Sequence, residues 1–310
     1  MEVVNVSIVV PVSGDGRSLA ALAARVEALR AGWDRPECPL RLLEAVLVDD
    51  GAPDAARPVL DGLAARLPWV RVVSLSRRFG RHRATAAGML HSSGDWIVTA
   101  EEDLALDPAR IPDLLRAAVA RRADVVYARP AGDAGGGVLA AAAALLAGNR
   151  VLGDATDLRL VRGPLGRAAA GACGHEAHLD VALSWFADRF AALPPFPEAG
   201  PGAAGGPPRG EGLADARRAV LASRVPLRRL AAVFGVAALV TAFACDWPPA
   251  VATTLFVGGV LGLLGAVQLE VLATVALHAH GKPAFFVVDR SPDGAIGEYL
   301  DRTAARAAPP

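Results

Sequence analysis

Lysine is almost absent from this sequence, and cysteine is scarce. Lys282 is the only lysine of the 310 residues, so nearly every cation is an arginine, and the formal net charge is zero. Without bulk basicity the chain lacks the general attraction that holds a polyanion, so we expect no nucleic-acid partner. The three cysteines, Cys38, Cys173 and Cys245, are odd in number and far apart in the sequence. They predict neither a disulfide framework nor a zinc site.

Charge is also missing from two long stretches near the C-terminus. Residues 230–245 carry no charged side chain, and residues 251–277 carry only Glu270. The second stretch is long enough to span a bilayer and the first is slightly short. Trp247, Pro248 and Pro249 lie between them, and a Trp at such a junction suits the membrane interface. We expect a hairpin of two transmembrane helices, and the alternative is a pair of buried core helices.

The flanking charges predict how this hairpin is oriented. An arginine-rich segment that includes Arg217, Arg218 and Arg224 precedes the first stretch, and Lys282 and Arg290 follow the second. The short connection carries no cation, so the positive-inside rule places both ends of the chain in the cytoplasm. Met1-Glu2 leads directly into apolar residues without the features of a signal peptide. We therefore expect a cell-membrane protein whose catalytic domain lies on the cytoplasmic face.

The first 130 residues alternate apolar runs of strand length with helical patterns. Strands are predicted over 6–12, 42–50, 69–76, 95–100 and 123–128, and helices over 18–29, 55–67, 81–91 and 108–121. This order is typical of an α/β domain with a mostly parallel, Rossmann-like sheet and helices on both faces. Ligands of such sheets bind at the carboxyl ends of the strands.

The remaining sequence divides the chain further. A helix is expected over 138–147 and a strand over 157–162, followed by a loop rich in Pro and Gly at 194–212. The predicted organisation is a catalytic domain over 1–193, that loop, a basic juxtamembrane helix over 213–229, two transmembrane helices within 230–279, and a cytoplasmic tail over 280–310.

The motif SGDG at 13–16 raises one alternative function, a dinucleotide site. Such a fingerprint needs a third small residue three positions later, where Leu19 stands, and an acid about 20 residues on. Asp49 and Asp50 come later than that spacing allows. A plain turn explains the motif better.

Acidic residues gather where predicted strands end. Asp50 ends the second strand, and Glu101, Glu102 and Asp103 follow the fourth. Carboxylates at one edge of a sheet can accept hydrogen bonds from a nucleoside and can hold a divalent cation that bridges a diphosphate. The alternative is that Glu101 and Glu102 are solvated loop charges. Asp107 before Pro108 is a helix-capping pattern, and we assign it no other role.

Taken together, these segments resemble family 2 glycosyltransferases of the GT-A fold, and among them the polyprenol-phosphate glycosyltransferases related to dolichol-phosphate mannose synthase. The similarity is carried by SIVVPV, LVDDGAPD, VVSLSRRFGRHRATAAGML, SSGDWIVTAEEDLALDPARIPDLL and ADVVYARP, and resumes at DATDLRLVR and VALHAHGKPAFFVV. It implies an inverting, metal-dependent transfer of a sugar from a UDP- or GDP-sugar to a polyprenyl phosphate. Homo-oligomer formation is left open.

The resemblance also implies roles for individual residues. Asp103 is implied as the ligand of Mg²⁺ or Mn²⁺, with Glu101 at the first acid of the family's D-x-D motif. Asp157 and Arg129 are implied as catalytic residues near the acceptor and its phosphate, since an Arg presents a fork of donors to phosphate. The residues implied for nucleotide-sugar binding are Pro11, Val12, Ser13, Asp50, Arg81, Glu101 and Glu102.

Some positions depart from the family pattern. The usual P-V-Y-N-E start is P-V-S-G-D here, Ala105 replaces a Gln that commonly completes the metal site, and AGDAGGG at 131–137 replaces further cations. Mg²⁺ keeps several waters, so a water can substitute for one lost ligand. These departures support a second hypothesis, in which the chain is a catalytically silent GT-A homologue that acts as a membrane scaffold or partner.

Overall fold

The computed structural model describes residues 3–100, 102, 110–128, 158–173 and 179–193, together with scattered positions between 251 and 288. The predicted helix over 138–147, the loop over 194–212 and the juxtamembrane helix over 213–229 lie outside the described residues. Most of the two long apolar stretches lies outside them as well. Within the described part, no helix is both long and apolar enough to cross a membrane.

The predicted alternation of strands and helices is confirmed over residues 4–127. In chain order the elements are β1 (Val4–Val12), α1 (Leu19–Trp33), β2 (Leu40–Asp49), α2 (Arg57–Arg66), β3 (Val70–Leu75), α3 (Arg81–Leu90), β4 (Trp96–Thr99), α4 (Ile111–Arg121) and β5 (Val125–Tyr127). The second part of the domain adds β6 (Arg159–Arg162), α7 (Gly163–Ala172), α8 (Leu179–Phe186) and β7 (Phe190–Ala192), and β8 (Val287–Val288) follows much later.

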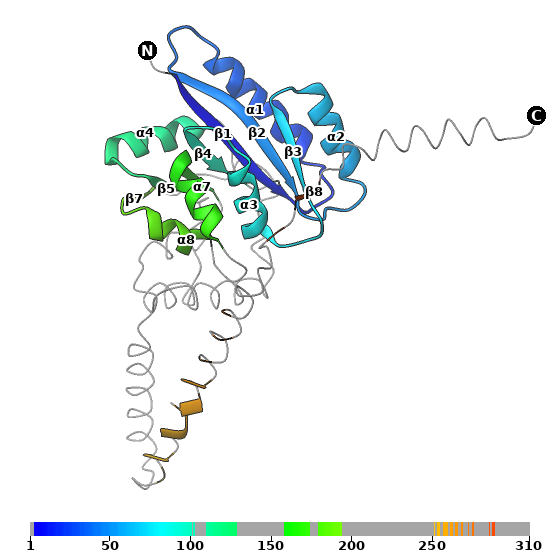
Figure 1. Cartoon of the computed structure of the whole chain (residues 1–310). Helices are drawn as coiled ribbons and strands as arrows, with labels where there is room; N and C mark the ends of the chain where they lie inside the picture. Colours follow the sequence, from blue (N-terminus) through cyan, green and yellow to red (C-terminus); the bar gives the residue numbers. More distant parts are fainter. Residues whose placement is uncertain are drawn as a thin grey trace, which may run out of the picture.

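These strands form an eight-stranded sheet in the order β7-β5-β6-β4-β1-β2-β3-β8 (Figure 1). β1 pairs in parallel with both β2 and β4, and β2 pairs in parallel with β3. β6 is antiparallel to its neighbours β4 and β5, so the predicted fifth strand is separated from the fourth by a strand that comes later in the sequence. The expected mostly parallel sheet is therefore present, with an antiparallel insertion that strand alternation alone did not reveal.

β8 extends the opposite edge of the sheet. Val287 and Val288 pair antiparallel with Leu75 and Ser74 of β3. The segment that follows the second apolar stretch in the sequence thus returns to the catalytic domain. This pairing covers the edge of β3, which would otherwise expose unpaired backbone groups.

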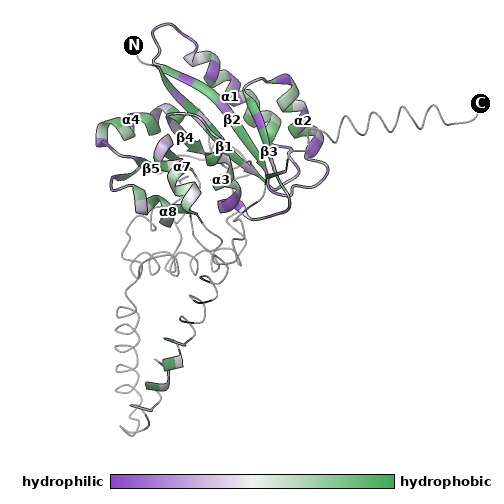
Figure 2. Cartoon of the chain, in the orientation of Figure 1, coloured by the Kyte–Doolittle hydropathy of each residue, from purple (hydrophilic) through white to green (hydrophobic). Residues whose placement is uncertain are grey.

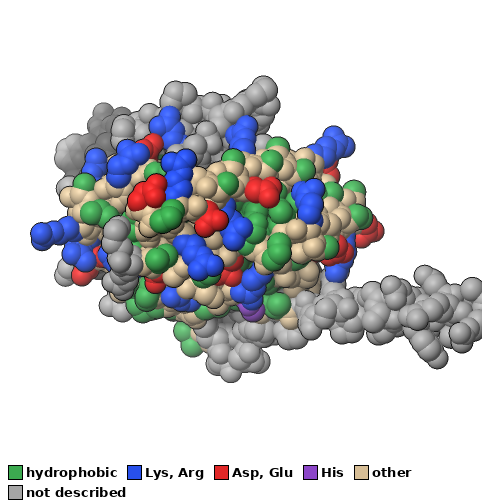
Figure 3. All heavy atoms as spheres, turned by 90° about the horizontal axis from the view of Figure 1, so that it is seen from above, with side chains coloured by type: hydrophobic (Ala, Val, Ile, Leu, Met, Phe, Trp, Pro, Cys, Tyr) green, Lys and Arg blue, Asp and Glu red, His purple; other side chains and the backbone are tan. Residues whose placement is uncertain are grey.

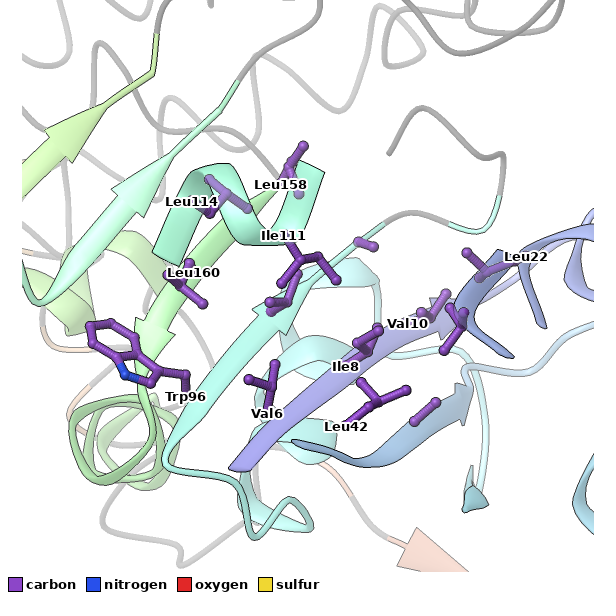
Figure 4. Close-up of a cluster of buried hydrophobic side chains, with 14 of the residues drawn as sticks. Val6, Ile8, Val10, Leu22, Leu42, Trp96, Ile111, Leu114, Leu158 and Leu160 are labelled. Carbon is purple, nitrogen blue, oxygen red and sulfur yellow. The ribbon is translucent and has the colours of Figure 1, made fainter. Parts of the chain in front are cut away.

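The core has two layers because side chains of a strand alternate between the faces of a sheet. Ile8 and Val10 of β1 face one layer, which α1, α2 and α4 complete, while Val9 faces the other, which α3, α7 and α8 complete. Figure 4 shows the first layer, where Ile8 and Val10 lie near Leu22 and Leu42 and where Ile111 and Leu114 cover Leu158 and Leu160. The strands are mostly apolar, with hydrophilic residues at a few positions, and the helices show both hydrophobic and hydrophilic residues (Figure 2).

Candidate active site

The direction of strand order reverses at the carboxyl ends of β1 and β4. β1 is followed in the chain by β2 on one side, whereas β4 lies on its other side. In doubly wound sheets ligands bind at such a reversal, because the loops after the two strands leave in opposite directions. Ser13 follows β1, Asp50 follows β2 and Ala100 follows β4. The Ala100 N–H donates to Val9 O, so β4 stays paired with β1 up to this edge.

Asp50 lies at this edge but is almost completely buried, with 1% of its surface exposed. Its two carboxylate oxygens accept the backbone N–H groups of Phe79 and Gly80, at 2.6 and 2.9 Å. Burial raises the pKa of Asp50, although these hydrogen bonds and the nearby Arg78 guanidinium lower it. Asp50 therefore fixes the loop between β3 and α3.

Gly51, which follows Asp50, lies close to the backbone of the same loop. Its φ of +67° lies in the left-handed region, and a Cβ there would come within 2.7 Å of the Arg78 backbone nitrogen. Both the conformation and the space favour glycine. The two loops after β2 and β3 are thus packed backbone to backbone.

The loop that Asp50 holds is basic. Arg77, Arg78, Arg81 and Arg83 lie in or next to it, and the Arg77 guanidinium sits 4.6 Å from the centroid of the Phe79 ring. Arg81 is the first residue of α3 and is half-buried, with no acid in the first helical turn. Cations are unfavourable at a helix N-terminus, so this charge suits an anion such as a diphosphate rather than the helix itself.

The predicted residues of the first loop are brought to the same edge. Pro11 and Val12 are the last residues of β1, paired with Val48 and Asp49 of β2. Ser13 is exposed, and its backbone N–H donates to Oε2 of Glu102 at 3.0 Å. The structure therefore joins Ser13 and Glu102, which are 89 positions apart in the sequence.

Four of the predicted site residues, Glu101, Asp103, Arg129 and Asp157, lie outside the described residues. Their neighbours in the chain are nevertheless side by side. Ala128 donates its N–H to Leu158 O at 3.1 Å, and Arg159 is paired with Thr99 on one side and Tyr127 on the other. Residues 101, 129 and 157 each come within two positions of this group. The sheet thus gathers described positions within two residues of Glu101, Arg129 and Asp157, whereas Asp103 is four positions beyond Thr99.

A buried polar cluster beneath this edge was not predicted as a unit. Asp180 of α8 accepts hydrogen bonds from Arg159 Nη1 at 2.5 Å and from the Tyr127 hydroxyl at 2.8 Å. Arg159 and Asp180 are each 1% exposed and Tyr127 is 2% exposed. Arg159 thus faces the interior. The sequence signal for Asp180 was an acid at the start of an otherwise apolar helix.

The neighbouring Cys173 belongs to the same interior. Burial raises the pKa of its thiol to about 11. A thiol with so high a pKa is not a nucleophile at neutral pH. The cluster formed by Arg159, Asp180 and Tyr127 therefore holds β5, β6 and α8 together and is not itself the site of chemistry.

Charges of both signs lie on the described part of the surface. On the face shown in Figure 3, basic and acidic side chains are interspersed with apolar ones. Among the described residues no group of three or more His, Cys, Asp or Glu side chains is placed to hold a metal ion.

Curated relatives match part of the chain. An undecaprenyl-phosphate 4-deoxy-4-formamido-L-arabinose transferase of Sodalis glossinidius is 38% identical over 128 residues, which are 41% of this chain and 37% of the relative. The enzyme of the same name from Pseudomonas aeruginosa strain LESB58 is 40% identical over 124 residues, 39% of this chain and 34% of its own. The chain thus spans little more than a third of the length of these relatives.

Solved structures share the fold. Glucosyl-3-phosphoglycerate synthase from Mycobacterium tuberculosis, in complex with phosphoglyceric acid, has a TM-score of 0.51 at 18% identity, covering 72% of this chain and 81% of that one. The same enzyme in complex with Mn²⁺, UDP and phosphoglyceric acid gives a TM-score of 0.50 at 18% identity, covering 72% and 80%. The model of glycosyl transferase family 2 matches residues 7–162, about half of the chain, from β1 to the end of β6. The chain belongs to glycosyl transferase family 2.

Proposed function

We propose that this glycosyltransferase moves a sugar from a UDP- or GDP-sugar to a polyprenyl phosphate at the cytoplasmic face of the cell membrane. The observation that carries the proposal is the convergence at one edge of the sheet of the loops after β1, β2 and β4 with residues 128 and 158. This edge presents a basic loop that Asp50 holds in place, beside the acidic sequence that follows β4. The similarity to transferases named for undecaprenyl phosphate supports the acceptor class.

The donor would lie across the edge with its diphosphate toward the basic loop. Arg77 and Arg78 are exposed and Arg81 is half-buried, so their guanidinium groups can meet phosphate oxygens with forked hydrogen bonds. Asp50 keeps this loop in place through the Phe79 and Gly80 N–H groups. Asp50 is also proposed to govern nucleotide affinity, either directly at the base or through this loop.

Transfer requires the acceptor phosphate oxygen to attack the anomeric carbon while the bond from that carbon to the diphosphate oxygen breaks. The new bond forms on the opposite side of the carbon, so the configuration inverts, and UDP or GDP leaves with the electron pair of the broken bond. The acceptor is already an anion, so a strong general base is less necessary than for an alcohol. Arg129 would bind the acceptor phosphate and Asp157 would lie beside it.

The donor set after β4 suits a hard divalent cation. Glu101 and Asp103 supply carboxylate oxygens, the ligand type that Mg²⁺ and Mn²⁺ prefer. Mn²⁺ accompanies UDP in the M. tuberculosis synthase of the same fold. When bound, the ion would neutralise charge on the departing diphosphate. We assign Asp103 as the principal protein ligand and Glu101 as secondary, since Ala105 offers no oxygen.

Membrane attachment is the remaining part of the proposal. Apolar side chains at described positions of the C-terminal stretch are about half exposed: Val251, Val257, Leu261, Leu272 and Val275. Exposed apolar side chains repeated along one stretch suit contact with lipid. Cysteine reporters at positions 2 and 305 should be protected from an external impermeant thiol reagent, and one at position 248 should react. Reaction at either terminus would refute the orientation.

The activity is tested by incubating membranes that contain the chain with a panel of UDP- and GDP-sugars and undecaprenyl phosphate. One donor should yield a lipid-linked sugar in the presence of Mn²⁺, and Asp103→Asn should abolish both the transfer and the metal-dependent nucleotide binding. Ala105→Gln should tighten metal binding by restoring an oxygen. Unchanged nucleotide binding in EDTA and in Asp103→Asn, without transfer from any donor, would instead support a silent homologue.

A further inference from the structure

The Glu102 side chain connects the segment after β4 to the loop after β1, the two neighbouring strands at which the strand order reverses. It follows β4 by three residues, yet its Oε2 accepts the backbone N–H of Ser13, which directly follows β1, at 3.0 Å. Glu102 as a residue is half-buried, and its hydrogen bond to Ser13 lies at the surface of the domain. A hydrogen bond to a carboxylate is about twice as strong as one between neutral groups. This contact therefore holds Glu102, which follows β4, against Ser13, which follows β1.

Gly14 provides the space for that carboxylate. A Cβ at position 14 would overlap Oε1 of Glu102 and would lie 3.2 Å from its carboxyl carbon. The glycines of the described residues with positive φ are Gly16, Gly51 and Gly80, so Gly14 is not required for its backbone conformation. Glycine is needed here for room alone. The two positions are thus coupled: a side chain at residue 14 would require the Glu102 carboxylate to move from the place that it occupies here.

We propose that Glu102 is a positioning residue of the donor site, whose carboxylate holds Ser13 and Gly14 of the loop after β1 beside the chain that leaves β4. This inference rests on the proposed function for the identity of the ligand. Glu102 stands between Glu101 and Asp103, the proposed metal-binding residues.

This coupling leads to a test by suppression, carried out with the full 310-residue chain. Glu102→Ala removes the hydrogen bond and should weaken UDP or GDP affinity about tenfold, the effect of losing one charge-assisted hydrogen bond. Gly14→Ala should weaken it by no more than Glu102→Ala does, because the new methyl group moves the carboxylate away from the Ser13 amide but does not remove it. The double variant should be no weaker than Glu102→Ala alone, since no carboxylate remains to be displaced.

Two further variants separate positioning from other roles. Glu102→Gln keeps an acceptor oxygen and should retain most of the affinity, whereas a loss as large as that of Glu102→Ala would assign the carboxylate to the metal and overturn the proposal. Gly62→Ala in α2, where a Cβ would meet nothing within 4 Å, is the matched control and should leave affinity unchanged.

Amide hydrogen exchange tests the hydrogen bond between Ser13 and Glu102 without any ligand. The Ser13 amide should be protected in the wild-type chain and in Gly62→Ala, and should exchange at least tenfold faster in Glu102→Ala and Gly14→Ala. Equal exchange in all of them, or losses of affinity that simply multiply in the double variant, would overturn the inference. Protection of Ser13 in a wild-type chain that binds no UDP or GDP would support the contact and refute the proposed function instead.

Discussion

Two regions of the domain bury an aspartate and use it differently. Asp50, at the carboxyl edge of β2, accepts neutral backbone N–H groups from the loop after β3. Asp180, between α8 and the sheet, accepts hydrogen bonds from a guanidinium and a tyrosine hydroxyl. The first carboxylate has no full positive charge bonded to it, and burial raises its pKa. The second is matched by a charge that is equally buried.

The difference shows which region can change state. A buried ion pair is stable only as a pair, because removing one partner leaves a buried charge without compensation. A carboxylate held by backbone N–H groups keeps its ionisation sensitive to its surroundings and can respond to a ligand at the edge. The Asp180 carboxylate thus supports the interior as half of an ion pair, whereas Asp50 supports a loop at the edge of the sheet. Four experiments test this difference.

The largest effect is expected from Asp180→Ala. The substitution leaves the Arg159 guanidinium buried without its carboxylate, which should lower the free energy of unfolding by about 3–5 kcal/mol. Replacing the pair by apolar residues, as in Arg159→Met with Asp180→Leu, should recover much of the loss. Chemical or thermal unfolding measures both. Asp61→Asn, at an aspartate whose side chain is 66% exposed, serves as a control and should change stability by less than about 0.5 kcal/mol. A loss no larger than that of the control would show that the Arg159–Asp180 pair is not a support.

Asp50→Ala should have a smaller effect on stability and a larger one on binding. The Phe79 and Gly80 N–H groups would lose their acceptor, at a cost of about 1–3 kcal/mol, and the basic loop would loosen. Affinity for UDP or GDP at saturating Mn²⁺ should fall, which calorimetry can measure, while Asp180→Ala in its folded fraction should keep the wild-type affinity. Unchanged nucleotide affinity in Asp50→Ala would mean that the nucleotide does not bind at the edge of the sheet where Asp50 lies.

The raised pKa of Asp50 predicts a particular dependence of stability on pH. The folded chain binds this proton more tightly than the unfolded chain, so the contribution of Asp50 is fully present below the ordinary pKa of 3.8 and declines as pH rises through the raised value. Asp50→Asn cannot titrate. The stability difference between wild type and Asp50→Asn should therefore be larger at pH 4 than at pH 7. A difference that grows with pH would indicate that the pKa of Asp50 is lowered instead.

The smallest effect concerns the cysteines. Burial raises the pKa of Cys173 to about 11, so little thiolate forms at pH 8, and Cys173 is 3% exposed. Cys38 is half-buried and lies outside this region. In a Cys245→Ala background, iodoacetamide should modify Cys38 of the folded chain and leave Cys173 unmodified, as mass spectrometry can show. Equal labelling would reveal that the interior around Asp180 opens readily.

Much of the fold could be predicted from local sequence. Apolar runs such as VSIVVPV and ADVVYA are buried strands, because both faces of the sheet are covered and every side chain of the strand meets a helix or the core. The position of β6 could not be read in this way. Its four residues resemble any short strand, and only long-range pairing with β4 and β5 inserts it between them in the opposite direction. The pairing of Val287 and Val288 with the edge of β3 is likewise a long-range contact that local sequence does not reveal.

The candidate site divides along the same line. The acidic residues at the strand ends could be found from the sequence, since Asp50, Glu101, Glu102 and Asp103 follow apolar runs of strand length. A parallel sheet directs those strand ends to one edge. The partners of three carboxylates are known from the tertiary structure alone. Asp50 accepts the Phe79 and Gly80 amides, Glu102 accepts the Ser13 amide, and Asp180 accepts the Arg159 guanidinium. Hydrogen bonds form between atoms about 3 Å apart, and such proximity between positions 21 to 89 residues apart arises only once the chain has folded.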